Sequence, residues 1–451
     1  MEETTEIYLL RELIDREAWG DLAEQFKQLH VQDIAEALHG LEAEVTLRAF
    51  QELSRERWAD VFAYIEPVEA QYPLLQKMDT ADGRYILEHL VPDDLTRLLE
   101  ALNKDEGEEI LKLLRPESVK QALRLLGYPE HSAGRLMTTQ FVTVRPDWTL
   151  EEALQSLRAL GDPGETINTI YVTDPQGRLQ GTISLKRLVL ESPDTRVESL
   201  MSGPAVSVMT ADDQTEAARM IQRYDINAMP VVDRTGVMHG VVTVDDVMDV
   251  LEEETTEDFH KIGGTGLLTM SLRDARPSLL YRKRVGWLVL LVFMNIFGGA
   301  AIAYFEETIE AVIALVFFLP LIVDSGGNAG SQSATLMVRA LAIGDVRPKD
   351  WLRLWGKELG VAAALGITMG LAVWGLGLWR GGPEVGTVVA LAMVCVVIFG
   401  SMIGMVLPFL LERLKFDPAT ASAPLITSIA DICGILIYFS IATAVLTLPA
   451  A

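Results

Sequence analysis

The sequence predicts a multidomain membrane protein with four parts. These are an all-α superhelical domain (1–130), an internally repeated α/β region (131–252), a connecting helix (253–280) and a transmembrane domain with five spans (281–451). Three observations lead to this prediction. Residues 1–280 hold 52 Asp and Glu against 27 Lys and Arg, whereas residues 281–451 hold 11 of each, so the first region carries the whole net charge of −25. Residues 137–252 contain two copies of a similar set of short segments. Apolar runs long enough to cross a bilayer are confined to the last region.

The first region has the pattern of repeated helices. Similar segments begin at Gln32, Trp58 and Asp93, and each places an acid ahead of an apolar helical stripe. Helical segments that recur in this way along a chain are typical of stacked helical hairpins that form a superhelix. Each acid taken singly is explained as a helix cap.

The second region contains two copies of one unit. Residues 142–144, 170–174 and 181–184 match residues 206–208, 229–233 and 240–243, and each copy alternates short apolar strands with helical patterns. These matches resemble a tandem CBS pair, a regulatory α/β module. Such pairs often hold an adenine nucleotide through a Thr or Ser followed three residues later by Asp. The second copy has Thr243 and Asp246, whereas the first has Ser184 and Arg187, so we expect at most one ATP site. Alternatively, these acids bind metal, or bind nothing.

A helical segment that runs from the end of the second region into the connecting helix gathers negative charge on one face. Asp246, Asp249, Glu253 and Glu257 follow the spacing i, i+3, i+7 and i+11, and no Lys or Arg stands between Arg234 and Lys261. Like charges at this spacing repel. The pattern therefore predicts a cationic counter-ion, with a solvated acidic face as the alternative.

The last region has five apolar stretches, at 285–305, 311–341, 361–379, 385–411 and 425–448. The polar, glycine-rich run 325–332 interrupts the second stretch, so we expect it to face protein or water. Basic residues cluster in every second connection, at 282–284, 339–357 and 413–415. This asymmetry predicts a cytoplasmic N-terminal region and an outside C-terminus.

Asp431, within the fifth stretch, predicts a cation site on a path through the membrane, because acids at this depth are costly and functional. The alternative is a structural acid that bonds Thr427 or Asn328. Asp324 could line the same path or cap a broken helix. Five spans make a thin wall, so two copies about a two-fold axis would enclose the path with two Asp431 carboxylates.

This order of parts, together with the motifs at 326–332, 417–419 and 424–431, resembles the MgtE family of magnesium channels over essentially the whole chain. The resemblance implies a homodimer in the plasma membrane that takes up Mg²⁺ and closes when cytoplasmic Mg²⁺ is high. It implies a pore site for hydrated Mg²⁺ at Asp431, which Asn328 suits chemically, and regulatory metal sites that join the helical domain, the CBS pair and the connecting helix. The implied regulatory ligands are Asp60, Asp93, Asp225, Asp246, Asp249, Glu254, Glu257, Asp258 and Asp417.

Other classes of function are weighed against this one. A secondary divalent-cation transporter, proton-coupled through Asp431, is the alternative, followed by a purely sensory membrane protein. We expect no enzyme, because the chain shows no nucleophile–base arrangement, phosphate-binding loop or HExxH motif. Nucleic acid is not an expected partner, since an acidic surface repels phosphates. The two cysteines, Cys395 and Cys433, exclude a disulfide framework.

Overall fold

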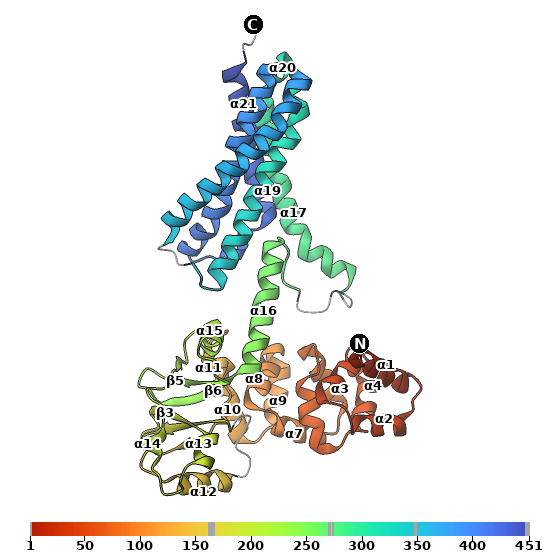
Figure 1. The fold of residues 1–451 in the computed structure, drawn as a ribbon. Coiled ribbons are helices and arrows are strands. Elements are labelled where there is room, and N and C mark those ends of the chain that lie inside the picture. Colours follow the sequence, from red (N-terminus) through yellow and green to blue (C-terminus); the bar gives the residue numbers. More distant parts are fainter. Residues whose placement is uncertain (1, 161–166, 269–271, 273–274, 347–349, 447–451) are drawn as a thin grey trace. The chain divides into compact units, whose positions relative to one another are not determined.

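The computed structural model describes residues 2–160, 167–268, 272, 275–346 and 350–446. Its internal contacts divide the chain into two units, Met1–Glu253 and Glu254–Ala451, which are described separately (Figure 1). The basic residues Arg347 and Lys349, which belong to the 339–357 connection, lie outside the described residues.

The first unit begins with a stack of short helices. Alternate helices pack on one another, α1 on α3, α3 on α5, α5 on α7 and α7 on α9, and this regular order is that of a superhelix. Ile34, Phe62 and Ile86 are fully buried in the shared core. The predicted all-helical domain is therefore confirmed. The helices are α1 (Glu2–Asp15), α2 (Trp19–Phe26), α3 (Val31–Leu38), α4 (Ala43–Phe50), α5 (Trp58–Ala63), α6 (Gln71–Lys77), α7 (Thr80–His89), α8 (Pro92–Ala101), α9 (Lys104–Leu113) and α10 (Pro116–Leu126).

The repeat in the sequence is a repeat in the structure. Strand β2 (Thr169–Thr173) pairs antiparallel with β3 (Leu179–Ser184), and β5 (Ala228–Val232) pairs antiparallel with β6 (Met238–Thr243). The residue pair Thr169–Ser184 of the first ladder corresponds to the pair Ala228–Thr243 of the second. Both ladders shift register between the fourth and fifth residues of the first strand. Strands β1 (Thr143–Val144) and β4 (Val208–Met209) run parallel to β2 and β5. The predicted pair of α/β repeats is therefore confirmed.

Helices complete each copy of the repeat. The first copy holds α12 (Leu150–Leu160), α13 (Leu185–Leu190) and α14 (Val197–Leu200), and the second holds α15 (Gln214–Tyr224). The short α11 (Ala133–Leu136) precedes them. Helix α16 (Val244–Ile262) begins directly after β6 and is anchored in the second copy by buried Val247 and Val250.

The second unit is a bundle of long apolar helices (Figure 1). They are α17 (Pro277–Tyr304), the short α18 (Glu306–Ala311), α19 (Ala314–Ala342), α20 (Trp351–Arg413) and α21 (Ala423–Val445). Four of the helices in the described residues are long and apolar enough to cross a membrane. A straight helix as long as α20 would extend about 95 Å, three times the hydrocarbon thickness, so it cannot be a single span.

Helix α20 reverses direction at Gly382, whose φ of 81° and ψ of −176° are not helical. A Cβ on Gly377 would lie 2.6 Å from Cα of Gly386, and a Cβ on Gly370 would lie 2.9 Å from the carbonyl oxygen of Ala390. These contacts pair the two halves of α20 antiparallel. The bundle therefore has five membrane-length segments, as predicted from the five apolar stretches.

The run 325–332 has buried glycines at Gly326, Gly327 and Gly330, as expected for a segment that faces protein. The run does not break its helix, because α19 is continuous from Ala314 to Ala342. Its glycines instead allow close helix packing. Gly326 and Gly330 contact Gly400 and Gly404 of α20. Consequently Asp324 does not cap a broken helix, and it lies within a regular turn of α19.

Candidate functional site

Acidic side chains of the first unit meet where α8 approaches α16. We call Asp94, Asp245, Asp246 and Asp249 the α8–α16 acidic cluster. Asp94 belongs to the first turn of α8, where Pro92 starts the helix and acids favour the helix dipole. Burial raises the pKa of Asp94, and the charges of Asp249 and Asp245 raise it further. The Arg97 guanidinium, 3.0 Å from Asp94 Oδ1, opposes this shift only in part.

Two carboxyl groups of this cluster that belong to α16, those of Asp246 and Asp249, also have raised pKa values, so their ionised form is disfavoured. Burial raises the pKa of Asp246 to about 6, although the Thr243 hydroxyl donates a hydrogen bond of 2.5 Å to its Oδ2. Burial likewise raises the pKa of Asp249 and of Glu253. Carboxylates that repel one another are the oxygen donors that hard divalent cations take. The cluster thus has the chemistry of a cation site.

The two copies of the repeat differ at the position expected to hold a nucleotide. In the second copy, Thr243 and Asp246 are bonded to each other at the start of α16. In the first copy, the Ser184 hydroxyl accepts the backbone N–H of Arg187 at 3.4 Å, and the Arg187 side chain donates to the Leu200 carbonyl oxygen at 2.8 Å. At this position the second copy presents a carboxylate that could accept ribose hydroxyls, whereas the first presents an arginine.

The C-terminal end of α16, in the second unit, holds another group of charges. Lys261 Nζ lies 2.5 Å from Oε1 of Glu257 and also pairs with Asp417, in the loop before α21. Burial raises the pKa of Asp258, and the charge of Asp417 raises it further. The structure thus brings together three of the predicted regulatory ligands, with an ammonium among them.

Polar groups of the membrane bundle meet between α19 and α21. The Asn328 amide donates a hydrogen bond of 2.9 Å to Asp324 Oδ2, and both side chains are exposed in the single chain. Asp431 of α21 is half-buried, and its charge interacts with that of Asp324. Among the described residues, the Asp431 side chain has no hydrogen bond to Thr427 or Asn328, the bonds that a structural acid would make. Two carboxylates and an amide therefore face the same region.

The remaining predicted ligands are more dispersed. Asp60 is exposed on α5, and Asp225, with φ of 52°, is exposed at the end of α15. Neither side chain forms an ion pair or hydrogen bond with another described residue. Asp93 is half-buried in α8 and Glu254 is half-buried in α16. In the described part of the chain, no three His, Cys, Asp or Glu side chains converge closely enough to hold a metal ion.

Sequence reasoning missed three residues of these groups, Asp94, Asp245 and Lys261. The charge of Asp94 interacts with the charges of Asp245 and Asp249, and the spacing of Asp94 from Arg97, three residues later, was the available signal. Lys261 was noted only as the end of the acidic run. Its pairing with Asp417 had no local signal, since 156 residues separate the two.

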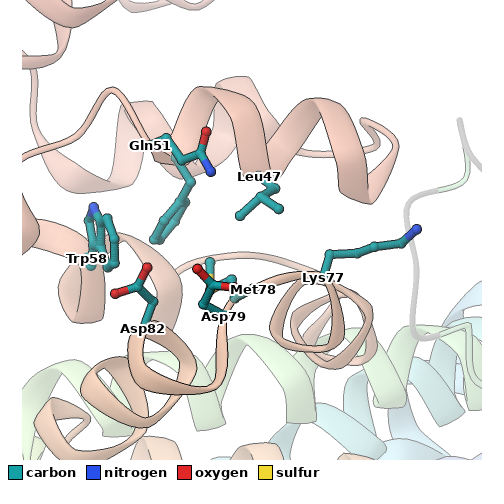
Figure 2. Close-up of a pocket in the computed structure, with 8 residues that line it drawn as sticks. Leu47, Gln51, Trp58, Lys77, Met78, Asp79 and Asp82 are labelled. Carbon is teal, nitrogen blue, oxygen red and sulfur yellow. The ribbon is translucent and has the colours of Figure 1, made fainter.

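A pocket of about 110 Å³ in the helical domain is separate from these groups. Figure 2 shows that Leu47 and Gln51 line it from one helix, with Asp79 and Asp82 opposite them beside Trp58. None of the predicted ligands lines this pocket.

Comparison with known proteins decides the family. A model described as a divalent cation transporter, MgtE, matches residues 319–441, a model of the MgtE intracellular N domain matches 29–131, and a CBS-domain model matches 133–194 and 197–253. The chain is 39% identical to the magnesium transporter MgtE of Thermus thermophilus over 93% of this chain and 94% of that protein. The chain belongs to the MgtE family of magnesium transporters. The MgtE proteins of Bacillus subtilis (35% identity over 83% of each chain) and Enterococcus faecalis (32% over 96% of each) are similar as well.

Solved structures of MgtE proteins resemble the first unit. The crystal structure of the soluble part of a magnesium transporter matches with a TM-score of 0.51 and 30% identity, over 56% of this chain and 99% of that one. The cytosolic domain of the Mg²⁺ channel MgtE in complex with ATP matches with a TM-score of 0.51 and 36% identity, over 54% and 99%. The family assignment confirms the resemblance found in the sequence. The chain is thus a multi-pass membrane protein of a transporter family.

Proposed function

We propose that this MgtE-family protein is a magnesium channel that admits Mg²⁺ to the cytoplasm and closes as cytoplasmic Mg²⁺ rises. The observation that carries the proposal is the group of Asp324, Asn328 and Asp431 between two membrane helices. Mg²⁺ gives up its water reluctantly, so a conduction site holds the hydrated ion through a few oxygens. Two carboxylates and an amide supply such oxygens, and their partial exposure leaves room for the ion's water shell.

A second copy of the chain completes this site in the proposal. Asp324 and Asn328 are exposed polar side chains on a helix that is long and apolar enough to cross a membrane. Exposure of a carboxylate to hydrocarbon costs several kcal/mol, about 2.5–3.5 on insertion scales. A homodimer about a two-fold axis covers these residues and doubles the oxygens around the path. The first unit then lies in the cytoplasm, as the basic connections predict.

Gating follows from repulsion within the acidic groups. Without bound metal, the like charges of the α8–α16 acidic cluster push α8 and α16 apart, and the charge of Arg97 opposes this repulsion. Bound Mg²⁺ offsets this repulsion and favours the closed state. A metal that shifts the population must bind that state more tightly, and several weak sites acting together supply the difference. The dispersed acids Asp60, Asp93, Asp225 and Glu254 join these sites as the parts approach, with Glu257, Asp258 and Asp417 at the far end of α16.

ATP binding at the second CBS copy is a finer part of the proposal. One similar cytosolic domain was crystallised with ATP. Here Asp246 is the carboxylate placed to accept the ribose hydroxyls, and Thr243 holds it in position at 2.5 Å. Arg187 in the equivalent place of the first copy cannot accept them.

Flux measurements on the full-length protein in liposomes test the channel. Entry of Mg²⁺ should be driven by voltage and should stop as Mg²⁺ is raised on the side of the first unit. Asp431→Ala should abolish entry while the protein keeps its elution volume in detergent. Normal Mg²⁺ entry through the Asp431→Ala protein would refute the pore role. Strict dependence on a pH gradient would instead favour the proton-coupled transporter.

A further inference from the structure

Lys261 ties the end of α16 to the loop before α21. Its ammonium lies 2.5 Å from Oε1 of Glu257, one turn earlier in the helix, and also bonds Oδ2 of Asp417. The other oxygen of Asp417, Oδ1, accepts the backbone N–H of Ala419 at 2.8 Å. This second bond fixes the Asp417 carboxylate at the start of a short 3-10 turn, Pro418–Thr420. One cation thus joins two elements through charge-assisted hydrogen bonds.

The charges at this junction do not balance. Glu257, Asp258 and Asp417 supply three carboxylates to one ammonium. The Lys261 ammonium pairs directly with two of them, Glu257 and Asp417. An ammonium already lies among the carboxylates that the proposed function assigns to regulatory Mg²⁺.

We propose that Lys261 is a tethered counter-ion that holds the end of α16 against the Asp417 loop when no metal is bound. The inference rests on the proposed closure by Mg²⁺ and refines it. The contact between Lys261 and Asp417 forms without bound metal. The dependence of closure on Mg²⁺ therefore arises mainly at the α8–α16 acidic cluster. There the cation is the Arg97 guanidinium, which lies 3.0 Å from Asp94 Oδ1 and faces a cluster of four carboxylates. Lys261 acts as a positioning residue and does not contact the permeant ion.

Removal of the ammonium should convert this contact into a magnesium-dependent one. Three carboxylates without Lys261 repel one another, and the loop separates from the helix unless a divalent cation replaces the lost charge. Lys261→Arg keeps the positive charge and serves as the conservative variant. Lys415→Gln is the matched control, because Lys415 lies two residues from Asp417, is exposed and forms no ion pair with any residue that the structure describes.

Hydrogen exchange of the full-length protein in lipid nanodiscs, read by mass spectrometry in EDTA and in millimolar Mg²⁺, tests the proposal. In EDTA, the segments 254–262 and 417–421 should exchange roughly threefold to tenfold faster in Lys261→Gln than in the parent, the size expected for losing a partly exposed charge pair and its hydrogen bonds. Lys261→Arg and Lys415→Gln should exchange like the parent. Mg²⁺ should restore the protection of Lys261→Gln.

The outcomes separate this inference from the proposed function. Unchanged exchange in Lys261→Gln without metal would overturn the inference, whatever the flux assay shows. Equally fast exchange in the parent without metal would also overturn it, since the contact would then not be held by Lys261. Faster exchange in Lys261→Gln that Mg²⁺ does not reverse would support the role of Lys261 and would refute magnesium binding at Asp417.

Discussion

Gly326 and Gly400 bring α19 and α20 into backbone contact, since a Cβ on Gly400 would lie 2.2 Å from the carbonyl oxygen of Gly326. Gly330 and Gly404 repeat this contact one turn further along both helices, at 2.0 Å. Small residues four positions apart allow such close packing in membranes. Asp324 and Asn328 are offset by two residues from Gly326 and Gly330, so they occupy the opposite face of α19. The glycine contact thus sets the direction in which the polar group points.

The first prediction concerns this contact. Gly400→Ala should force α19 away from α20 and lower the stability of the bundle by about 1–3 kcal/mol or more, as overpacking does. The thermal midpoint in detergent, followed by size-exclusion chromatography after heating, measures the effect. Gly375→Ala is the matched control in the same helix, because its Cβ would meet nothing within 4 Å. Equal midpoints for the two variants would contradict the close packing.

The second prediction concerns metal sensing by α16. Replacing Asp246, Asp249 and Glu257 together by Ala removes carboxylates from both acidic groups, so closure should require roughly tenfold more Mg²⁺, a coupling typical of regulatory sites. Flux into liposomes, measured while Mg²⁺ is titrated on the side of the first unit, gives the half-closing concentration.

A charge-matched control for that experiment replaces three exposed acids outside the cluster, Glu108, Glu117 and Glu130, by Ala. This variant loses the same net charge and should close like the parent. If both triple variants shift equally, closure responds to overall charge and the assignment of the cluster as the sensor is wrong.

The third prediction is a pH dependence. Burial raises the pKa of Asp246 to about 6, and it raises those of Asp94 and Asp249 in the same direction. A carboxyl with a higher pKa in the folded state contributes stability that is complete below its unfolded pKa and is lost as the pH rises through its folded pKa. For Asp246 this window runs from pH 3.8 to about 6.

Lowering the pH through this window in EDTA should therefore stabilise the first unit, by about 1–3 kcal/mol for a shift of this size. Mg²⁺ should stabilise it more at neutral pH than at the acidic end, since protons and metal relieve the same repulsion. Thermal denaturation of the full-length protein followed by circular dichroism measures both effects. Asp246→Asn should reduce the pH dependence, and an unaltered dependence in that variant would be a contradiction.

The fourth prediction distinguishes the two CBS copies. Asp246→Asn should weaken ATP binding by roughly tenfold or more, because a hydrogen bond to a charged group contributes about 1.5–3 kcal/mol. Arg187→Ala should leave the affinity unchanged, since Arg187 bonds the Leu200 carbonyl oxygen and its copy lacks the acid. Calorimetry with the full-length protein measures both. A larger loss in Arg187→Ala would place the nucleotide in the first copy.

Much of the fold could be predicted because its signals are local. Matched segments predicted the two ladders, whose registers agree at Thr169–Ser184 and Ala228–Thr243. Hydropathy predicted five spans. The sequence could not predict whether the helix continues through the run 325–332. Glycines can either break a helix or allow it to pack closely, and the outcome depends on the partner helix. Likewise, the interaction of Asp94 with the acids of α16 and the pairing of Asp417 with Lys261 depend on the chain fold, since each joins residues that lie far apart in the sequence.

The reversal at Gly382 also constrains topology. Because α20 crosses the bilayer twice, its two ends, Trp351 and Arg413, emerge on the same side. With α17, α19 and α21 the total number of crossings is odd, so Arg276 and Leu446 must be separated by the membrane whichever way the protein inserts.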